Sequence, residues 1–210
     1  AAYLEAYDST SAIVDGDIAA TSINGGATGL SSTTVNLDSS LFNDGSISAE
    51  GYGFATAADF NAGSSLYVYN NGSIDATAHG DTAVATGVEG TATTAGIHID
   101  NEDSIGATSD YTAIGLNLSS NSYVDLYNYG SITADGGTNS IAIDTSGGAS
   151  TDYIYNAGTI TGAIYTGTGD DYLYNEVGAT WNAMGYSDFG AGDDTIVNQG
   201  TITLDDSGIY

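Results

Sequence analysis

The feature that most constrains this chain is a short motif, aliphatic-x-Asn-x-Gly-Ser/Thr-Ile, that returns along most of its length. Clear copies read LFNDGSI ending at Ile47, VYNNGSI ending at Ile74 and LYNYGSI ending at Ile132. An earlier segment, IVDGDI ending at Ile18, is a degenerate first copy. Successive copies lie 19 to 31 residues apart. This spacing is too short for separate domains and is typical of one turn of a solenoid.

The asparagines set the register of the repeat. The residue two before each asparagine is aliphatic in all seven copies, and the residue four after is Ile in six, with Ala179 the exception. Alternate residues therefore face one side, as in a β-strand, and a Gly two residues after the Asn permits a corner. We expect the asparagines to point inward and to stack as a ladder. Its members are Asn43, Asn70, Asn101, Asn128, Asn156, Asn175 and Asn198.

These observations predict an all-β fold, a right-handed single-stranded parallel β-helix (β-solenoid) of about eight coils. The chain forms one domain, 1–210, in which 1–36 is an atypical first coil, 37–204 holds the regular repeats and 205–210 is the C-terminal end. Segments 112–116 and 140–144 are expected to supply a third strand per coil. A β-sandwich of many short strands is the alternative, but it does not explain a repeated Asn-x-Gly core.

The charge balance excludes one class of partner. The 210 residues include 27 Asp and Glu but neither Lys nor Arg, so the formal net charge is −27. A surface of one negative sign repels DNA and RNA and lacks the basic side chains that contact phosphate. No run of 18 apolar residues occurs, so no membrane span is expected. Cations from the solvent must balance most of the carboxylates.

The repeat also carries a family resemblance. The Asn-x-Gly-Ser/Thr-Ile units, together with GTGDDYLYN and GAGDDTIVNQGTIT near the end, resemble the passenger repeats of bacterial autotransporters over about residues 10–204. The resemblance implies a parallel β-helix displayed outside a Gram-negative cell, with a role in adhesion, aggregation or biofilm structure. It therefore implies an extracellular or bacterial cell-surface location.

An acidic column is the first candidate binding site. The residues four before the last three asparagines are Asp152, Asp171 and Asp194, and Asp170 and Asp193 stand one residue earlier in two of these copies. Stacked carboxylates repel one another unless a cation bridges them, and oxygen ligands suit Ca²⁺. The GxGDD stretches resemble part of a calcium-binding nonapeptide but recur after 23 residues rather than nine. Two interpretations stay open, a calcium site or solvated turn aspartates, and no cofactor is required.

A stripe of tyrosines is the second candidate. These residues alternate with the inward aliphatic positions, so we expect them to face outward from one sheet. They could stack on one another between coils, contact another subunit or bind sugar rings. The members of this surface aromatic stripe are Tyr67, Tyr69, Tyr127, Tyr153, Tyr155, Tyr172 and Tyr174.

The function expected from the sequence is structural. The chain is interpreted as an extracellular subunit of a filament or matrix, a homopolymer assembled by end-to-end stacking of its terminal coils, whose strand edges are uncapped. The alternative is a cleaved autotransporter passenger that acts as an adhesin or as a surface for cell or matrix polysaccharide. A third alternative is a polysaccharide-degrading β-helix enzyme. We do not expect an enzyme, because lyase chemistry in such folds uses Arg or Lys and no carboxylate pair stands out.

Overall fold

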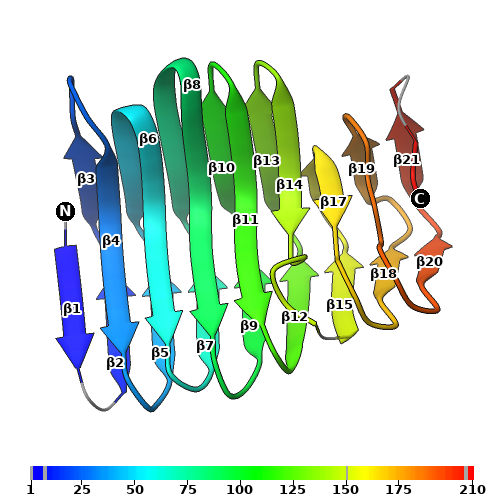
Figure 1. Ribbon diagram of the computed structural model, residues 1–210, viewed down its shortest axis with the longest axis horizontal. Helices are drawn as coiled ribbons and strands as arrows, with labels where there is room; N and C mark the ends of the chain where they lie inside the picture. The colour runs from blue at the N-terminus through cyan, green and yellow to red at the C-terminus, as the bar shows by residue number, and fades with distance from the viewer. Residues whose placement is uncertain (1, 7–8, 150, 206–207) are drawn as a thin grey trace.

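The computed structural model describes residues 2–6, 9–149, 151–205 and 208–210. It confirms a parallel β-solenoid, because all strand pairings in the described chain are parallel and join each repeat to the next. The strands stack side by side along the long axis, from the N-terminal end to the C-terminal end (Figure 1). Within the described residues there is no helix long and apolar enough to cross a membrane.

One side of the solenoid is an eight-stranded sheet with a strand from every copy of the repeat. Each of these strands ends at or just beside the motif asparagine, or at Val14 in the first copy. In stacking order they are β2 (Thr10–Val14), β5 (Ser39–Asn43), β7 (Leu66–Asn70), β9 (Ile97–Asn101), β12 (Tyr123–Asn128), β15 (Thr151–Asn156), β18 (Tyr172–Asn175) and β20 (Thr195–Asn198).

The other two sides belong to one 13-stranded sheet that folds around a corner. The second side contains β3 (Asp17–Thr21), the first parts of β6 (Ser46–Ala62) and β8 (Ser73–Ala92), β10 (Ser104–Ser109), β13 (Ser131–Gly136), β16 (Thr159–Thr161), β19 (Thr180–Ala183) and β21 (Thr201–Leu204). The third side contains β1 (Ala2–Ala6), β4 (Ala27–Thr34), the later parts of β6 and β8, β11 (Thr112–Ser120), β14 (Asn139–Asp144) and β17 (Ala163–Tyr165). The third strands expected at 112–116 and 140–144 are confirmed by the pairing of β11 with β14.

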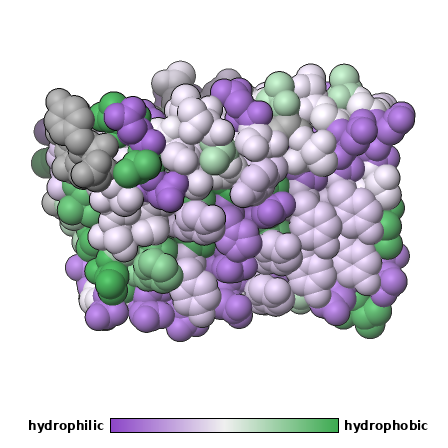
Figure 2. Space-filling model, turned by 90° about the horizontal axis from the view of Figure 1, so that it is seen from below, coloured by the Kyte–Doolittle hydropathy of each residue, from purple (hydrophilic) through white to green (hydrophobic). Residues whose placement is uncertain are grey.

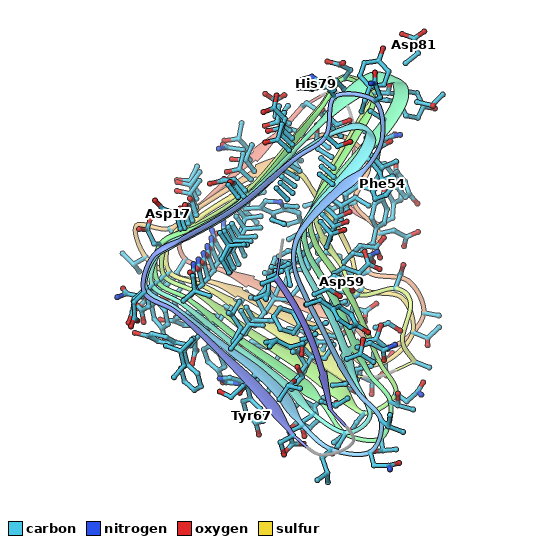
Figure 3. All side chains as sticks on the ribbon, turned by 90° about the vertical axis from the view of Figure 1, so that its left-hand side faces the viewer. Asp17, Phe54, Asp59, Tyr67, His79 and Asp81 are labelled. Atoms are coloured by element: carbon cyan, nitrogen blue, oxygen red, sulfur yellow. The ribbon has the colours of Figure 1, made fainter. Side chains whose placement is uncertain are left out.

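The outline seen along the axis is triangular, with rows of side chains filling the interior (Figure 3). Six turns carry strands on all three sides, from β2–β3–β4 to β15–β16–β17, and two more carry only β18–β19 and β20–β21. The expected eight coils are therefore six complete turns and two incomplete ones. In the last turns, glycines with positive φ, among them Gly185 and Gly190, replace the third strand, and isolated bridges such as Tyr165↔Asp188 remain.

The core consists of the inward residues of the repeat. The aliphatic residues two before each asparagine, Leu41 to Leu173, are at most 1% exposed, as burial on the inner face of a solenoid requires. The isoleucines four after the asparagine form a second buried column. In the coil of Asn175 the residue in this column is Trp181, which pairs with Ile160 and Ile202. The expectation that Ala179 would stand there is wrong. A turn two residues longer after Asn175 shifts the register, and the indole takes the place of an isoleucine.

The corner between the second and third sides, called the third corner below, accommodates differences in coil length. Between β6 and β8 the register moves from Tyr52↔His79 to Phe54↔Val84, so β8 holds three more residues at this corner than β6 does. Gly53 and Gly80 have φ of +93° and +122°, which an L side chain rarely adopts, and they let the strands bend. Figure 3 places His79 and Phe54 beside this corner and Asp81 at its tip.

Candidate functional site

The seven asparagines form the expected ladder inside the corner that follows the eight-stranded sheet. From Asn43 to Asn175, each Nδ2 donates a hydrogen bond to the Oδ1 of the asparagine in the next coil, at 2.7–2.8 Å. The same amide donates to a backbone carbonyl of the next coil at 2.9–3.2 Å. The six asparagines from Asn43 to Asn175 are fully buried, and Asn198 is exposed in β20, the last strand of this sheet. The ladder therefore joins coils through side chains as well as through strand pairing.

The acidic column lies at the start of the same strands and bonds to the backbone. The carboxylate of Asp152 accepts from the backbone N–H of Val124, that of Asp171 from Asp152, and that of Asp194 from Asp171. The distances are 2.8–3.1 Å. Asp152 and Asp171 are 1% exposed. Burial raises the pKa of Asp171, and the nearby charges of Asp194 and Asp170 raise it further.

The two remaining aspartates of the predicted site lie apart from this column, on the surface. Asp170 accepts from the backbone N–H of Asp193 at 2.9 Å, and both residues are exposed. The glycine turns beside them pack directly on each other: a Cβ at Gly190 would overlap the Gly167 carbonyl oxygen. Among the described residues, no three carboxylate or imidazole groups are grouped so as to hold a metal ion. Calcium binding stays a prediction.

The outer face of the eight-stranded sheet carries the tyrosines in two columns. One column contains Tyr67, His98, Asp125, Tyr153 and Tyr172 in register, and the other contains Phe42, Tyr69, Asp100, Tyr127, Tyr155 and Tyr174. All seven tyrosines of the surface aromatic stripe therefore lie on this face. His98, Asp100 and Asp125 interrupt the two columns near the middle of the sheet.

The rings stack most regularly toward the C-terminal end of this face. Tyr153 lies parallel to Tyr172, with ring centroids 5.5 Å apart and planes 2° apart, and Tyr155 lies parallel to Tyr174 at 5.7 Å and 3°. Tyr127 contacts both Tyr153 and Tyr155 at 5.8–6.0 Å. Figure 2 shows broad aromatic rings tiled over this part of the surface. The tyrosines thus stack on one another between coils, and their outer faces stay partly exposed.

One of these tyrosines has a carboxylate partner. The hydroxyl of Tyr155 donates a hydrogen bond to Oε2 of Glu176 at 2.5 Å, across to the next coil. The hydrogen bond to Glu176, aided by burial and by the negative charge of that carboxylate, raises the pKa of Tyr155 to about 12. The phenol is therefore held neutral with its proton directed at a base.

A groove of about 560 Å³ crosses the N-terminal half of the same face. Its aromatic walls are Phe42, Tyr67 and Tyr69, and Ser40 and Asp100 are among its polar lining residues. Phe42 and Tyr69 contact each other with ring centroids 6.5 Å apart. The groove therefore combines ring faces with hydroxyl and carboxylate groups. The sequence pattern indicated the aromatic residues but not the hollow between them.

Both histidines direct hydrogen bonds at carboxylates. His98 Nε2 lies 3.1 Å from Asp100, and its ring packs between Tyr67 and Tyr127. His79 Nε2 lies 3.2 Å from Glu50 at the third corner. These imidazoles take part in surface pairing, and neither arrangement adds support for catalysis.

Comparison with protein-family models, with curated proteins and with solved structures finds no match to this chain.

Proposed function

We propose that this chain is an extracellular structural protein, a β-solenoid rod that builds or coats a bacterial surface or matrix. The observation that supports it is the asparagine ladder, in which six side-chain hydrogen bonds join seven successive coils. A mostly buried amide column that is hydrogen-bonded from coil to coil makes neighbouring coils difficult to separate. Such a body is suited to bearing load and resisting proteases without disulfides.

The composition supports the same role. The chain has no Cys, and the absence of Lys and Arg leaves no trypsin cleavage site. A net charge of −27 favours solubility outside the cell and disfavours contact with nucleic acid. The resemblance of the repeats to autotransporter passengers points to the same extracellular location.

The rods are proposed to assemble end to end, with the last coil of one molecule stacked on the first coil of the next. Ile196 in β20 is 37% exposed, although the residues aligned with it in the two preceding coils, Leu173 and Ile154, are at most 1% exposed. Leu204 in β21 is 52% exposed. An edge of this kind accepts either a further coil of the same chain or the first coil of another molecule.

Negative-stain electron microscopy and sedimentation velocity on the full chain test this proposal. We expect rods that associate end to end as concentration rises, with width unchanged. Ile196→Asp should abolish the association, because it places a charge on the stacking edge, whereas Val177→Asp at an exposed turn should not. Isolated rods at every concentration, with and without millimolar Ca²⁺, would contradict self-assembly.

Contact with neutral polysaccharide is a second candidate function, favoured by the groove at Phe42, Tyr67 and Tyr69. Sugar rings stack on aromatic faces and hydrogen-bond to carboxylates and hydroxyls, and the groove supplies all three. The negative charge of the chain disfavours acidic polysaccharides. A glucan or another uncharged chain therefore fits this surface best.

Affinity electrophoresis in gels that contain neutral or acidic polysaccharides tests the second candidate. We expect retardation by a neutral polymer, reduced by Tyr67→Ala or Tyr69→Ala. The matched control is Tyr111→Ala, at a similarly exposed tyrosine outside the groove. Retardation that both groove variants leave unchanged would exclude the groove as the binding surface.

A further inference from the structure

The chain has few ways to form a covalent bond between coils. It contains no Cys and no Lys, so neither a disulfide nor a lysine isopeptide bond can form. It contains 16 Tyr, whose phenols can be joined through their rings by one-electron oxidation. Which of them are placed for this chemistry is decided by ring geometry and by the availability of a proton acceptor.

We propose that Tyr155 and Tyr174 form an oxidative crosslinking site, in which a peroxidase-type oxidant joins the two rings as dityrosine. The site is independent of the proposed structural role and of polysaccharide binding. The bond would tie β15 to β18, two strands that at present are joined only by non-covalent contacts.

The geometry holds the two reacting rings side by side. Tyr155 and Tyr174 are in register on neighbouring strands, their ring centroids lie 5.7 Å apart, and their planes differ by 3°. Both residues are half-buried, so the sheet restricts the movement of the rings while part of each residue stays accessible to an oxidant. Coupling of ortho carbons requires the two rings to turn edge to edge, because the new bond joins an edge of one ring to an edge of the other. This arrangement replaces a diffusional encounter with a fixed pair.

Glu176 supplies the proton acceptor. When a phenol loses an electron, its hydroxyl becomes strongly acidic, and the proton leaves most easily along an existing hydrogen bond to a base. The 2.5 Å bond from Tyr155 to Glu176 provides that path, and it also keeps the phenol protonated until oxidation. Tyr155 is therefore the tyrosine that we expect to be oxidised first.

The reaction balances with hydrogen peroxide as the two-electron oxidant. Tyr155 and Tyr174 each lose one electron and the phenolic proton, which gives two neutral phenoxyl radicals. Their unpaired electrons form one carbon–carbon bond between ortho positions, and each ortho hydrogen then moves to the oxygen of its own ring, restoring both phenols. Overall the protein loses two hydrogens, and one peroxide is reduced to two waters.

Two other stacked tyrosine pairs lack part of this arrangement. Tyr153 and Tyr172 are equally parallel, but neither hydroxyl has a hydrogen-bonded carboxylate in the described structure. Tyr186 and Tyr210 lie closer, at 4.9 Å, with planes 22° apart, but the Tyr186 hydroxyl is 3.4 Å from Asp188. A contact of that length transfers a proton poorly. These pairs are expected to react more slowly.

The test treats the full chain with a peroxidase and hydrogen peroxide and follows dityrosine fluorescence. We expect a monomer that is lighter by two hydrogens, and a crosslinked peptide that contains both Tyr155 and Tyr174 after digestion with chymotrypsin. Tyr155→Phe should remove this crosslink, and Glu176→Gln, which keeps a polar partner but no base, should slow its formation by about tenfold. Tyr69→Phe is the matched control in the same column and should change neither.

Circular dichroism and the emission of Trp181 check that each variant is folded. Crosslinks found mainly between molecules, or mainly at other tyrosines, would overturn the proposal. A rate that Glu176→Gln leaves unchanged would overturn the role of the carboxylate. These outcomes differ from a loss of self-assembly or of polysaccharide binding, so each proposal fails separately.

Discussion

Val14 lies in register directly beside Asn43, at the position that every later coil fills with asparagine. The Oδ1 of Asn43 is buried and accepts no hydrogen bond in the described structure, because a valine has no donor to offer. Val14→Asn should extend the ladder by one member and stabilise the fold by about 1 kcal/mol. Urea denaturation measures the change. Val14→Ala is the control and should destabilise, so equal stability of the two variants would argue against the explanation.

The middle of the ladder should be its most sensitive part. Asn128→Ala removes the Oδ1 that accepts from Asn101 and the Nδ2 that donates to Asn156, both in a buried column. We expect a loss of about 2–4 kcal/mol of unfolding free energy. Asn198→Ala, at the exposed member of the ladder, should cost less than about 1 kcal/mol. Urea denaturation at one pH compares the two, and similar losses would contradict the role assigned to burial.

Asp171 should destabilise the protein at neutral pH. Its Oδ1 accepts from the Asp152 N–H, but its Oδ2 is buried without a hydrogen-bond partner in the described structure. Asp171→Asn keeps the first acceptor and removes the charge, so we expect a gain of about 1 kcal/mol at pH 7. Thermal unfolding at pH 7 provides the measurement, with Asp193→Asn as an exposed control. A bound cation at Asp171 would reverse the sign of the effect.

The protein should become more stable on mild acidification. Burial raises the pKa of Asp59, Asp75, Glu89 and Asp171 in the folded state. A carboxyl with a raised pKa binds its proton more tightly in the folded state than in the unfolded state. The free energy of unfolding therefore rises as the pH falls from 7 through those raised pKa values. The gain is complete below the pKa of the unfolded state, about 4. Asp38, whose pKa is lowered by a hydrogen bond from the Ser65 N–H, acts oppositely but is exposed. Thermal melts from pH 7 to 4 check the direction, and a steady fall in melting temperature would contradict it.

Salt should stabilise the fold through general screening. With 27 acidic residues and no Lys or Arg, most charge–charge interactions are repulsive, so the melting temperature should rise between low salt and about 0.15 M NaCl. CaCl₂ at matched ionic strength separates screening from a specific site. An extra rise with calcium that Asp170→Asn or Asp194→Asn removes would establish the predicted calcium site. Equal melting temperatures in NaCl and CaCl₂ would indicate that these aspartates only accept hydrogen bonds from the backbone.

Most of the fold could be predicted because the repeat places the same residue types on the same side of every coil. Leu126, Asn128 and Ile132 are all inward, and a strand period of two allows no other register for this pattern. Ala179 was wrongly assigned to the isoleucine column, which Trp181 occupies, because the turn after Asn175 is two residues longer than in other copies. The mark of the longer turn is Gly178, which has a φ of +90° and stands three residues after Asn175 instead of two.

The chemistry of the candidate site was less predictable. The position of Asp171 four before an asparagine indicated a column, but the partner of its carboxylate is a backbone N–H in the neighbouring coil, which only the pairing register reveals. The contact between Tyr155 and Glu176 likewise joins residues 21 apart. Side chains of different coils meet at distances fixed by stacking, and the sequence gives those distances only once every coil length is known.

The third corner has a consequence for how such a chain can change. The three additional residues between His79 and Val84 are accommodated there, while Ile74 and Ala92 on either side keep their pairing with Ile47 and Ala62. Foreign peptides grafted at Asp81 should therefore be displayed on the ridge of the rod without shifting the rest of the molecule. The inward positions of the repeat tolerate little change, whereas the third corner tolerates insertions. New recognition sequences can therefore be acquired at this corner, one coil at a time.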